Sequence, residues 1–204
     1  MEPSQVLNQA AFSVLNQTNC PPPAPEVVAA LLQLEKTAKR EKSQYSLAQL
    51  AGTWRLCLIT GTRKTRAKAG IILGAGRYLP PWVKIQLTYT ATGIIPNSAP
   101  VIATGTVENH VQVKAVQFAL TGPIKFLPPK NILAFDFNRM SIQVLGLKLY
   151  DGWIRGGQQS QVTFTQERIS HQAFFAYFWI SQTVIAARGR GGGLALWGKV
   201  PLGY

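Results

Sequence analysis

The sequence predicts a mainly β protein, a closed or nearly closed antiparallel β-barrel that follows an N-terminal helical extension. From Gly52 onward, short apolar runs alternate with glycine, proline and asparagine, a pattern typical of a barrel of about ten short strands. In residues 173–180 both faces of one strand are apolar, which places that strand between two buried surfaces. Residues 26–42 have the pattern of an amphipathic helix, which must lie on another part of the protein. We therefore expect a barrel that is covered by a helix on one side.

Length and composition set the limits of this fold. The chain has 204 residues, of which 47% are hydrophobic and 14% are charged. It is too apolar for a disordered protein and long enough for one domain with a sizeable core. We expect the helical extension over residues 1–45 and the barrel domain over residues 46–204. The longest apolar run, residues 173–187, is interrupted by polar residues and is shorter than the roughly 20 residues of a membrane-spanning helix.

Two helices are expected in the extension, over residues 5–17 and 26–42, with a proline-rich segment between them. Pro25 suits the first turn of a helix, where its missing N–H costs nothing. Packing on the barrel is the favoured interpretation of the second helix, and contact with a membrane surface is the alternative. Its apolar stripe consists of Val27, Val28, Leu31, Leu32 and Leu34.

The expected strands follow one another from residue 53 to the C-terminal end. Residues 82–90 show the clearest alternation of apolar and polar side chains. Residues 108–110 are expected to form an exposed connection, Asp151-Gly152 a turn, and the glycine-rich residues 189–193 a hairpin turn. The predicted strands span residues 53–60, 82–90, 101–107, 111–120, 132–136, 140–149, 161–168, 173–180, 183–188 and 194–200.

The strand over residues 173–180 indicates where a ligand would bind. We assign Phe175, Tyr177 and Trp179 to one face and the alternate residues, from Phe174 to Ile180, to the other. In an antiparallel barrel the two neighbouring surfaces are the interior and a covering helix. An apolar ligand cavity inside the barrel is therefore the first functional hypothesis.

The net charge of +13 lies on the predicted barrel, because the charges of the first 50 residues are balanced. A basic surface favours an anionic partner, although it also aids solubility alone. One cluster of four cations is expected in an exposed loop. We favour acidic lipid headgroups as its partner over RNA, because the segment lacks the aromatic residues that stack on bases. A solvated loop is the alternative for this cluster, which consists of Arg63, Lys64, Arg66 and Lys68.

Residues suited to catalysis or metal binding are few in the predicted barrel. No spacing there pairs an acid with a base or fits a metal site. We therefore predict no enzymatic activity, no metal and no resident cofactor. The glycines of residues 70–76 precede no expected helix, which argues against a dinucleotide site. The groups considered are Glu108, His110, Asp136, Asp151, Glu167 and His171.

An intracellular protein is expected, with no secretory signal and no transmembrane segment. The first residues lack a basic segment followed by an apolar one. Cys20 and Cys57 lie in unlike surroundings, the first beside a run of prolines and the second in an expected strand. We predict two free thiols rather than a disulfide.

Residues 50–56, Leu-Ala-Gly-Thr-Trp-Arg-Leu, resemble the start of a lipocalin-type barrel. That resemblance implies that Trp54 closes one end of the barrel and that an arginine from a late strand covers its indole ring. Arg188 is the better placed candidate for this cation, and Arg190 is the alternative.

Together with residues 185–196, Ile-Ala-Ala-Arg-Gly-Arg-Gly-Gly-Gly-Leu-Ala-Leu, this start resembles the plastid lipid-associated protein (fibrillin) family. The resemblance is strongest at the two ends of the barrel domain. It implies a lipocalin-like (calycin-type) barrel and a bound isoprenoid, quinone, carotenoid or fatty ligand. It also implies a peripheral place on the cytoplasmic side of a cyanobacterial thylakoid membrane, or in a plastid if the chain is a mature plant protein.

The leading hypothesis is a non-enzymatic protein that binds such a ligand in its barrel and associates peripherally with anionic membranes. The first alternative is a scaffold or assembly factor for a photosynthetic pigment or electron-transfer complex, with that complex or a biosynthetic enzyme as its partner. The second is an enzyme, a bilin lyase on the same type of barrel. The candidate ligand-binding residues are Trp54, Tyr89, Phe118, Phe135, Phe137, Trp153, Phe164, Tyr177, Trp179 and Arg188.

Overall fold

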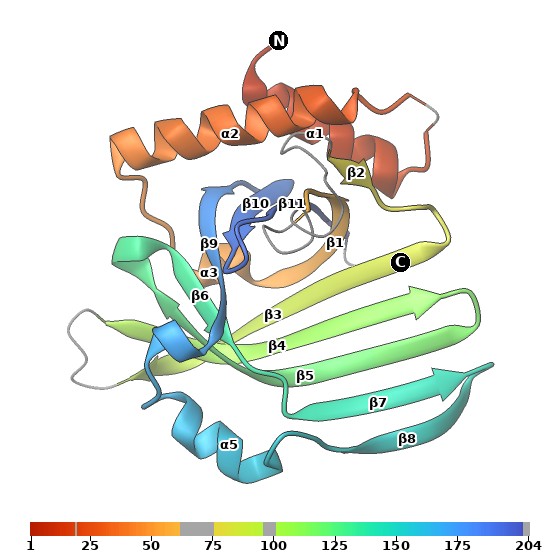
Figure 1. Ribbon diagram of the computed structural model, residues 1–204, viewed down its shortest axis with the longest axis vertical. Helices are drawn as coiled ribbons and strands as arrows, with labels where there is room; N and C mark the ends of the chain where they lie inside the picture. Colours follow the sequence, from red (N-terminus) through yellow and green to blue (C-terminus); the bar gives the residue numbers. More distant parts are fainter. Residues whose placement is uncertain (19, 62–75, 96–100, 202–204) are drawn as a thin grey trace.

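The computed structural model describes residues 1–18, 20–61, 76–95 and 101–201, and its strands form a closed antiparallel barrel, as predicted (Figure 1). Within these residues eight strands make the ring, and the last one pairs with the first. Chain order follows ring order, as in an up-and-down barrel. The ring strands are β1 (Gly52–Ile59), β3 (Val83–Ile95), β4 (Ile102–Val113), β5 (Val116–Leu127), β6 (Ile132–Phe135), β9 (Ala173–Ile180), β10 (Val184–Gly189) and β11 (Leu194–Lys199). The short β2 (Arg77–Tyr78) pairs with β1.

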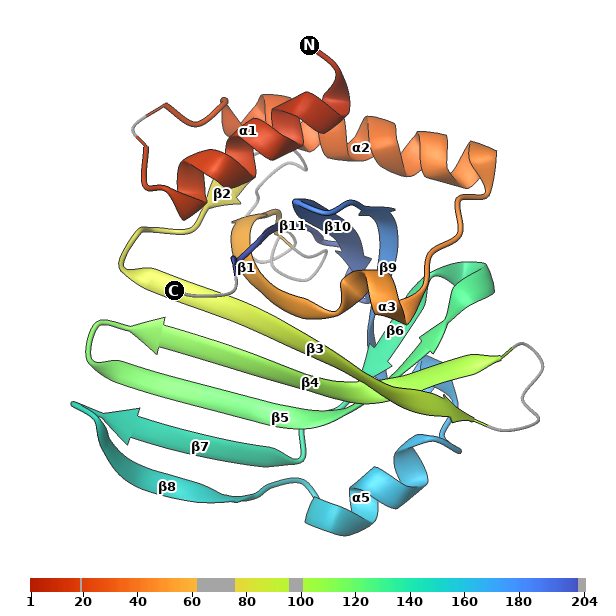
Figure 2. The same ribbon diagram turned by 180° about the vertical axis from the view of Figure 1, so that it is seen from behind.

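Two N-terminal helices, α1 (Pro3–Leu15) and α2 (Ala24–Glu41), cover one side of the barrel (Figures 1 and 2). Val27 and Leu31 of α2 pack with Phe178 and Leu196 of the barrel wall in one buried cluster. The favoured interpretation of α2, packing on the barrel, is therefore confirmed. Leu32 is the exception in the predicted stripe, because it is exposed.

A second buried cluster lies in the barrel interior. It includes Trp54, Tyr89 and Trp197, which are among the largest fully buried side chains. Both terminal residues of the short helix α3 (Leu47–Leu50) join this cluster. Helix α3 thus closes one end of the barrel.

Strand β9 lies between the two clusters, as its sequence predicts, but a β-bulge changes which residues face inward. Tyr177 pairs with Ala187, whereas Trp179 pairs with Ala186, so one residue of β9 is extra in the register. Tyr177 faces the interior, and Trp179 packs on the helix side. The assignment of Trp179 to the face of Tyr177 is wrong, because strict alternation does not continue through a bulge.

Beyond the barrel, β3, β4 and β5 continue into a sheet that β7 (Arg139–Val144) and β8 (Leu147–Trp153) widen (Figure 2). We call the outer halves of β3, β4 and β5, together with β7 and β8, the sheet extension. At its outer edge, the strand register aligns Val83, Val113, Val116 and Val144 in one row.

The two faces of the sheet extension differ in polarity. One face continues the barrel interior and is apolar, as the paired residues Ile85, Val111, Phe118 and Ile142 show. The opposite face is polar, as the paired residues Lys84, Gln112, Gln117 and Gln143 show. The apolar face is only partly covered, since Phe118 is 37% exposed.

The predicted strand over residues 161–168 is wrong, because Gly157–Phe164 form the helix α5. Lys125 of β5 holds the C-terminal end of this helix. Its Nζ donates hydrogen bonds to the carbonyls of Phe164 at 2.9 Å and Glu167 at 2.6 Å. A cation is favoured at this end of a helix. This tertiary contact stabilises a helix in a run of residues whose pattern resembles that of a strand.

Two predicted connections lie inside strands instead. Residues 108–110 are part of β4, which runs through the predicted break. Asp151-Gly152 are part of β8, where the Asp151 carboxylate pairs with Arg139 and Lys148. The predicted single strand over residues 140–149 is the hairpin of β7 and β8.

Candidate functional site

An apolar cavity of about 160 Å³ lies in the barrel interior. Such concave, mainly apolar hollows with few polar groups are typical of small-molecule sites. The strands β1, β3, β4, β6, β9 and β11 contribute to its wall. The lining residues are Leu56, Ile85, Leu87, Tyr89, Val107, Asn109, Phe135, Phe137, Phe175 and Trp197.

One wall of the cavity is a continuous set of aromatic rings. The ring centroid of Phe135 lies 5.1 Å from Phe175 in a stacked arrangement and 5.4 Å from Phe137. Phe175 in turn meets Trp197 edge to face at 5.3 Å. Rings at these distances stabilise one another, so the wall presents a fixed surface of aromatic faces and edges.

The cavity borders the sheet extension. Its partly buried lining residues are Ile85, Asn109, Phe135, Phe137 and Phe175, and of these Ile85 and Asn109 lie on the strands of the extension. Ile85 also belongs to the apolar face of the extension. The apolar wall of the cavity therefore continues onto that face.

Two buried tyrosines meet beside the cavity. The hydroxyls of Tyr89 and Tyr177 are 2.8 Å apart and form a hydrogen bond in which either is the donor. Burial raises the pKa of both phenols well above the ordinary value of 10.0. Both are therefore neutral at physiological pH, and they add no charge to the interior.

Two polar atoms of lining residues have no hydrogen-bond partner among the described residues. One is the acceptor Asn109 Oδ1, and the other is the donor Trp197 Nε1. A buried polar atom without a partner carries a free-energy penalty of about 1–3 kcal/mol. A bound molecule with a hydroxyl or carbonyl group is one way to remove that penalty.

The closed end of the barrel is built around Trp54. Its indole Nε1 donates to the carbonyl of Leu50 at 2.7 Å, and Lys199 Nζ lies 4.3 Å from the ring centroid. Lys199 Nζ also donates to the carbonyl of Ala51 at 2.5 Å. Gly52 has φ +113°, and a Cβ there would lie only 2.5 Å from Lys199 Nζ. The Gly-x-Trp motif thus combines a backbone that favours glycine with a space that Lys199 occupies.

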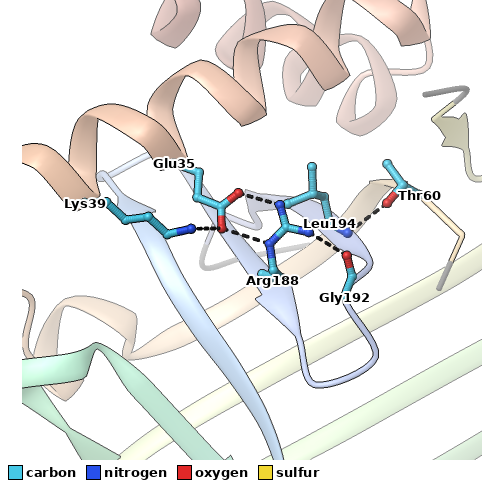
Figure 3. A network of polar contacts seen from close by, with 6 residues as sticks. All are labelled: Glu35, Lys39, Thr60, Arg188, Gly192 and Leu194. Carbon is cyan, nitrogen blue, oxygen red and sulfur yellow. Dashed lines mark hydrogen bonds and ion pairs between the residues drawn. The ribbon is translucent and has the colours of Figure 1, made fainter. Parts of the chain in front are cut away.

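The prediction that Arg188 covers Trp54 is wrong, because Lys199 supplies the cation. Arg188 points to α2 instead, where its Nε donates to Glu35 Oε1 at 2.8 Å and its Nη2 donates to the other carboxylate oxygen (Figure 3). Its Nη1 donates to the carbonyl of Gly192 at 2.6 Å. Arg188 therefore ties the hairpin of β10 and β11 to the covering helix.

The surrounding contacts extend this network (Figure 3). Lys39 Nζ lies 3.1 Å from Glu35 Oε1, and the backbone N–H of Leu194 donates to Thr60 Oγ1 at 2.8 Å. Hydrogen bonds from Arg188 lower the pKa of the Glu35 carboxyl below its ordinary value of 4.5. The same bonds raise the pKa of Arg188, so both groups stay charged at neutral pH.

The structure brings only some of the candidate ligand-binding residues together. Tyr89, Phe135 and Phe137 line the cavity. Trp54 and Tyr177 belong to the interior cluster beside it. The others lie on the sheet extension, at α5 or on the helix side of the barrel, and they are Phe118, Trp153, Phe164, Trp179 and Arg188.

Sequence reasoning missed several lining residues. Phe175 had a usable signal, because it shares a strand face with Tyr177. Trp197 and Asn109 had none, since their inward placement depends on the register of β11 and β4 in the closed ring. The sequence places Asn109 between two expected strands and so predicts an exposed connection there, whereas the structure places it within β4.

The four cations predicted to contact a membrane lie outside the described residues, so their role stays a prediction. They are Arg63, Lys64, Arg66 and Lys68.

Across residues 1–18, 20–61, 76–95 and 101–201, no group of three or more His, Cys, Asp or Glu side chains is arranged to hold a metal ion. Within the same part of the chain, no helix has the length and apolarity needed to cross a membrane. Cys20 is exposed and Cys57 is buried, and both are free thiols, as predicted.

The fold and the cavity together define a class of protein: a closed antiparallel β-barrel, covered by helices on one side, with an apolar hollow inside. A scan against protein-family models finds no match for the chain, and a search of curated proteins finds none either. The resemblance to the fibrillin family therefore stays a prediction.

Proposed function

We propose that the chain is a non-enzymatic binding protein that holds part of an apolar molecule in its barrel cavity. The observation that carries this proposal is the cavity itself, with its aliphatic and aromatic lining and two buried polar atoms, Asn109 Oδ1 and Trp197 Nε1, that have no hydrogen-bond partner among the described residues. The ligand class is also the one that the resemblance to the fibrillin family implies.

The size of the cavity narrows the ligand class. A cavity of roughly 150 Å³ is large enough for benzene. The hollow of about 160 Å³ therefore fits one ring or an equivalent length of chain, and any further apolar part would lie along the partly buried apolar face that begins at Ile85. A quinone or another isoprenoid with a small oxygen-bearing ring fits this arrangement better than a ligand that the barrel encloses completely.

The proposal is tested by titrating the purified protein with a short-tailed benzoquinone and recording tryptophan fluorescence. Trp197 is a lining residue, so a quinone in the cavity quenches it directly. We expect saturable quenching by the wild type. Val107→Phe fills part of the cavity and should weaken the apparent affinity about tenfold or more.

Val101→Phe is the matched control, because the same substitution falls on a side chain that is 55% exposed. It should bind as the wild type does. The proposal is wrong if quenching never saturates, or if Val107→Phe binds with unchanged affinity while its thermal unfolding shows that it is folded.

A further inference from the structure

Three connections meet at the outer edge of the sheet extension. Trp82 precedes β3, Lys114 and Ala115 link β4 to β5, and Leu145 and Gly146 link β7 to β8. The register that aligns the four valines places these connections side by side. Both views show the turns between β4 and β5 and between β7 and β8 together at one side of the molecule (Figures 1 and 2).

Large apolar side chains are exposed along this edge. Trp82 is 57% exposed, and the hairpin of β7 and β8 adds Leu145 at 79%, Leu147 at 70% and Leu149 at 67%. Scattered single apolar residues are normal on a protein surface, but several large ones gathered along one edge are typical of an interaction site.

The turn residue Leu145 is unusual for its position. Leu145 and Gly146 have φ values of 52° and 80°, as in a tight hairpin turn whose first position favours asparagine. A leucine in this left-handed region costs free energy. Burial of the side chain does not offset that cost, because Leu145 is the most exposed of the four residues.

Lysines flank the same edge. Lys84 and Lys114 are exposed beside Trp82 and the turn between β4 and β5, and Lys148 lies between the exposed leucines of β8. Asp151, on the same hairpin, is held by Lys148 and Arg139. Apolar tips with adjacent cations are complementary to the surface of an acidic bilayer, where tryptophan lies at headgroup level and lysine attracts anionic lipid.

We infer that this edge inserts its apolar tips into the interface of a membrane that contains acidic lipid. The contact goes beyond the proposed ligand binding and does not depend on it, because it uses a different surface. The residues that make the contact are Trp82, Lys84, Lys114, Leu145, Leu147, Lys148 and Leu149.

The test is sedimentation of the full chain with vesicles of phosphatidylglycerol mixed with phosphatidylcholine, and with vesicles of phosphatidylcholine alone. We expect binding to the acidic vesicles that salt weakens. Leu145→Asn with Leu147→Thr should weaken it about tenfold or more, because two apolar side chains no longer leave water. Lys84→Gln with Lys114→Gln should weaken it by a similar factor, at roughly fivefold for each lysine.

Leu145→Asn also separates a loss of contact from a loss of fold. Asparagine suits the turn better than leucine, so this variant should melt at the same temperature as the wild type or higher while it binds vesicles less. Phe12→Gln and Lys36→Gln are matched controls on the exposed surface of the N-terminal helices, and they should bind as the wild type does.

The inference is overturned if the wild type does not sediment with acidic vesicles, or if the variants at the edge bind as the wild type does. It is also overturned if Leu145→Asn with Leu147→Thr leaves vesicle binding unchanged but shifts the mass of the particle in solution, since the edge would then join copies of the chain. None of these results affects the quinone titration, so the two proposals fail separately.

Discussion

At the scale of single residues, the closed end of the barrel depends on Trp54. Its indole is fully buried, Lys199 Nζ lies over one face of the ring, and the indole N–H donates a hydrogen bond to the carbonyl of Leu50. Trp54→Ala should lower the free energy of unfolding in urea by about 3–5 kcal/mol, because a large cavity would remain. Trp153→Ala is the matched control at an exposed tryptophan and should change it by only about 0.5 kcal/mol. Equal stability of the two variants would contradict this account of the Gly-x-Trp motif.

A second prediction at this scale concerns the pair of Glu35 and Arg188. Because the folded-state pKa of Glu35 is lowered, its contribution to stability is present above the unfolded value, near 4.5, and is lost as the pH falls through the folded value. Glu35→Gln should therefore be less stable than the wild type at neutral pH, by about 1–3 kcal/mol. The difference should shrink below pH 4.5 in urea unfolding at a series of pH values.

The control for this pair is the neighbouring cation. Lys39 is mostly exposed, so Lys39→Gln should change the stability by only about 0–1 kcal/mol. Arg188→Gln should reproduce the loss, and the double variant with Glu35→Gln should lose less than the sum of the two. Additive losses would mean that the two side chains do not act as a pair.

For the cation over Trp54, the sequence could predict that a cation is present but not which residue supplies it. The resemblance of residues 50–56 to a lipocalin-type start implies a buried indole covered by a cation, and a buried indole with a cation over it is confirmed. The partner depends on strand register, because Lys199 pairs directly with Trp54 across β1 and β11. Arg188 lies within the late strand β10, which made it the expected cation. Its partner is Glu35 of α2 instead, and no local sequence pattern links these two positions.

At the scale of elements, α2 offers a test with neighbouring residues. Leu31 is fully buried against the barrel, whereas Leu32 is 43% exposed. Leu31→Ala should lower the free energy of unfolding by about 2–5 kcal/mol, because a cavity would form between the helix and the barrel. Leu32→Ala should change it by only about 0.5 kcal/mol. Similar losses for the two variants in urea unfolding would mean that α2 does not pack as described.

The elements that were predicted correctly are those with a long periodic pattern. Alternation over residues 82–90 gives β3, and the apolar stripe gives α2. Helix α5 could not be predicted in this way, because it is short and held by a tertiary contact to Lys125. The prediction for residues 108–110 was also wrong, because β4 has no apolar run there. One side of the strand faces solvent, and the inward-facing residue is the polar Asn109.

At the scale of the whole molecule, the closed barrel with helices on one side follows from the two-sided apolar pattern of β9. The position of the cavity does not. It arises where residues from six strands converge, and the bulge in β9 removes Trp179 from that place. The sheet extension was not expected at all, because hairpins inside and outside a barrel have the same local sequence pattern.

The apolar face that runs from the cavity to the edge has a kinetic consequence. Under the proposed membrane contact and ligand binding, a molecule that slides from a bilayer along Val83 and Ile85 into the barrel would keep one side against apolar protein. It would not have to dissolve in water, which is the slow step for most long-chain lipids. The rate of delivery between two membranes would then be set by how often the loaded protein collides with them, and would hardly change with the water solubility of the cargo.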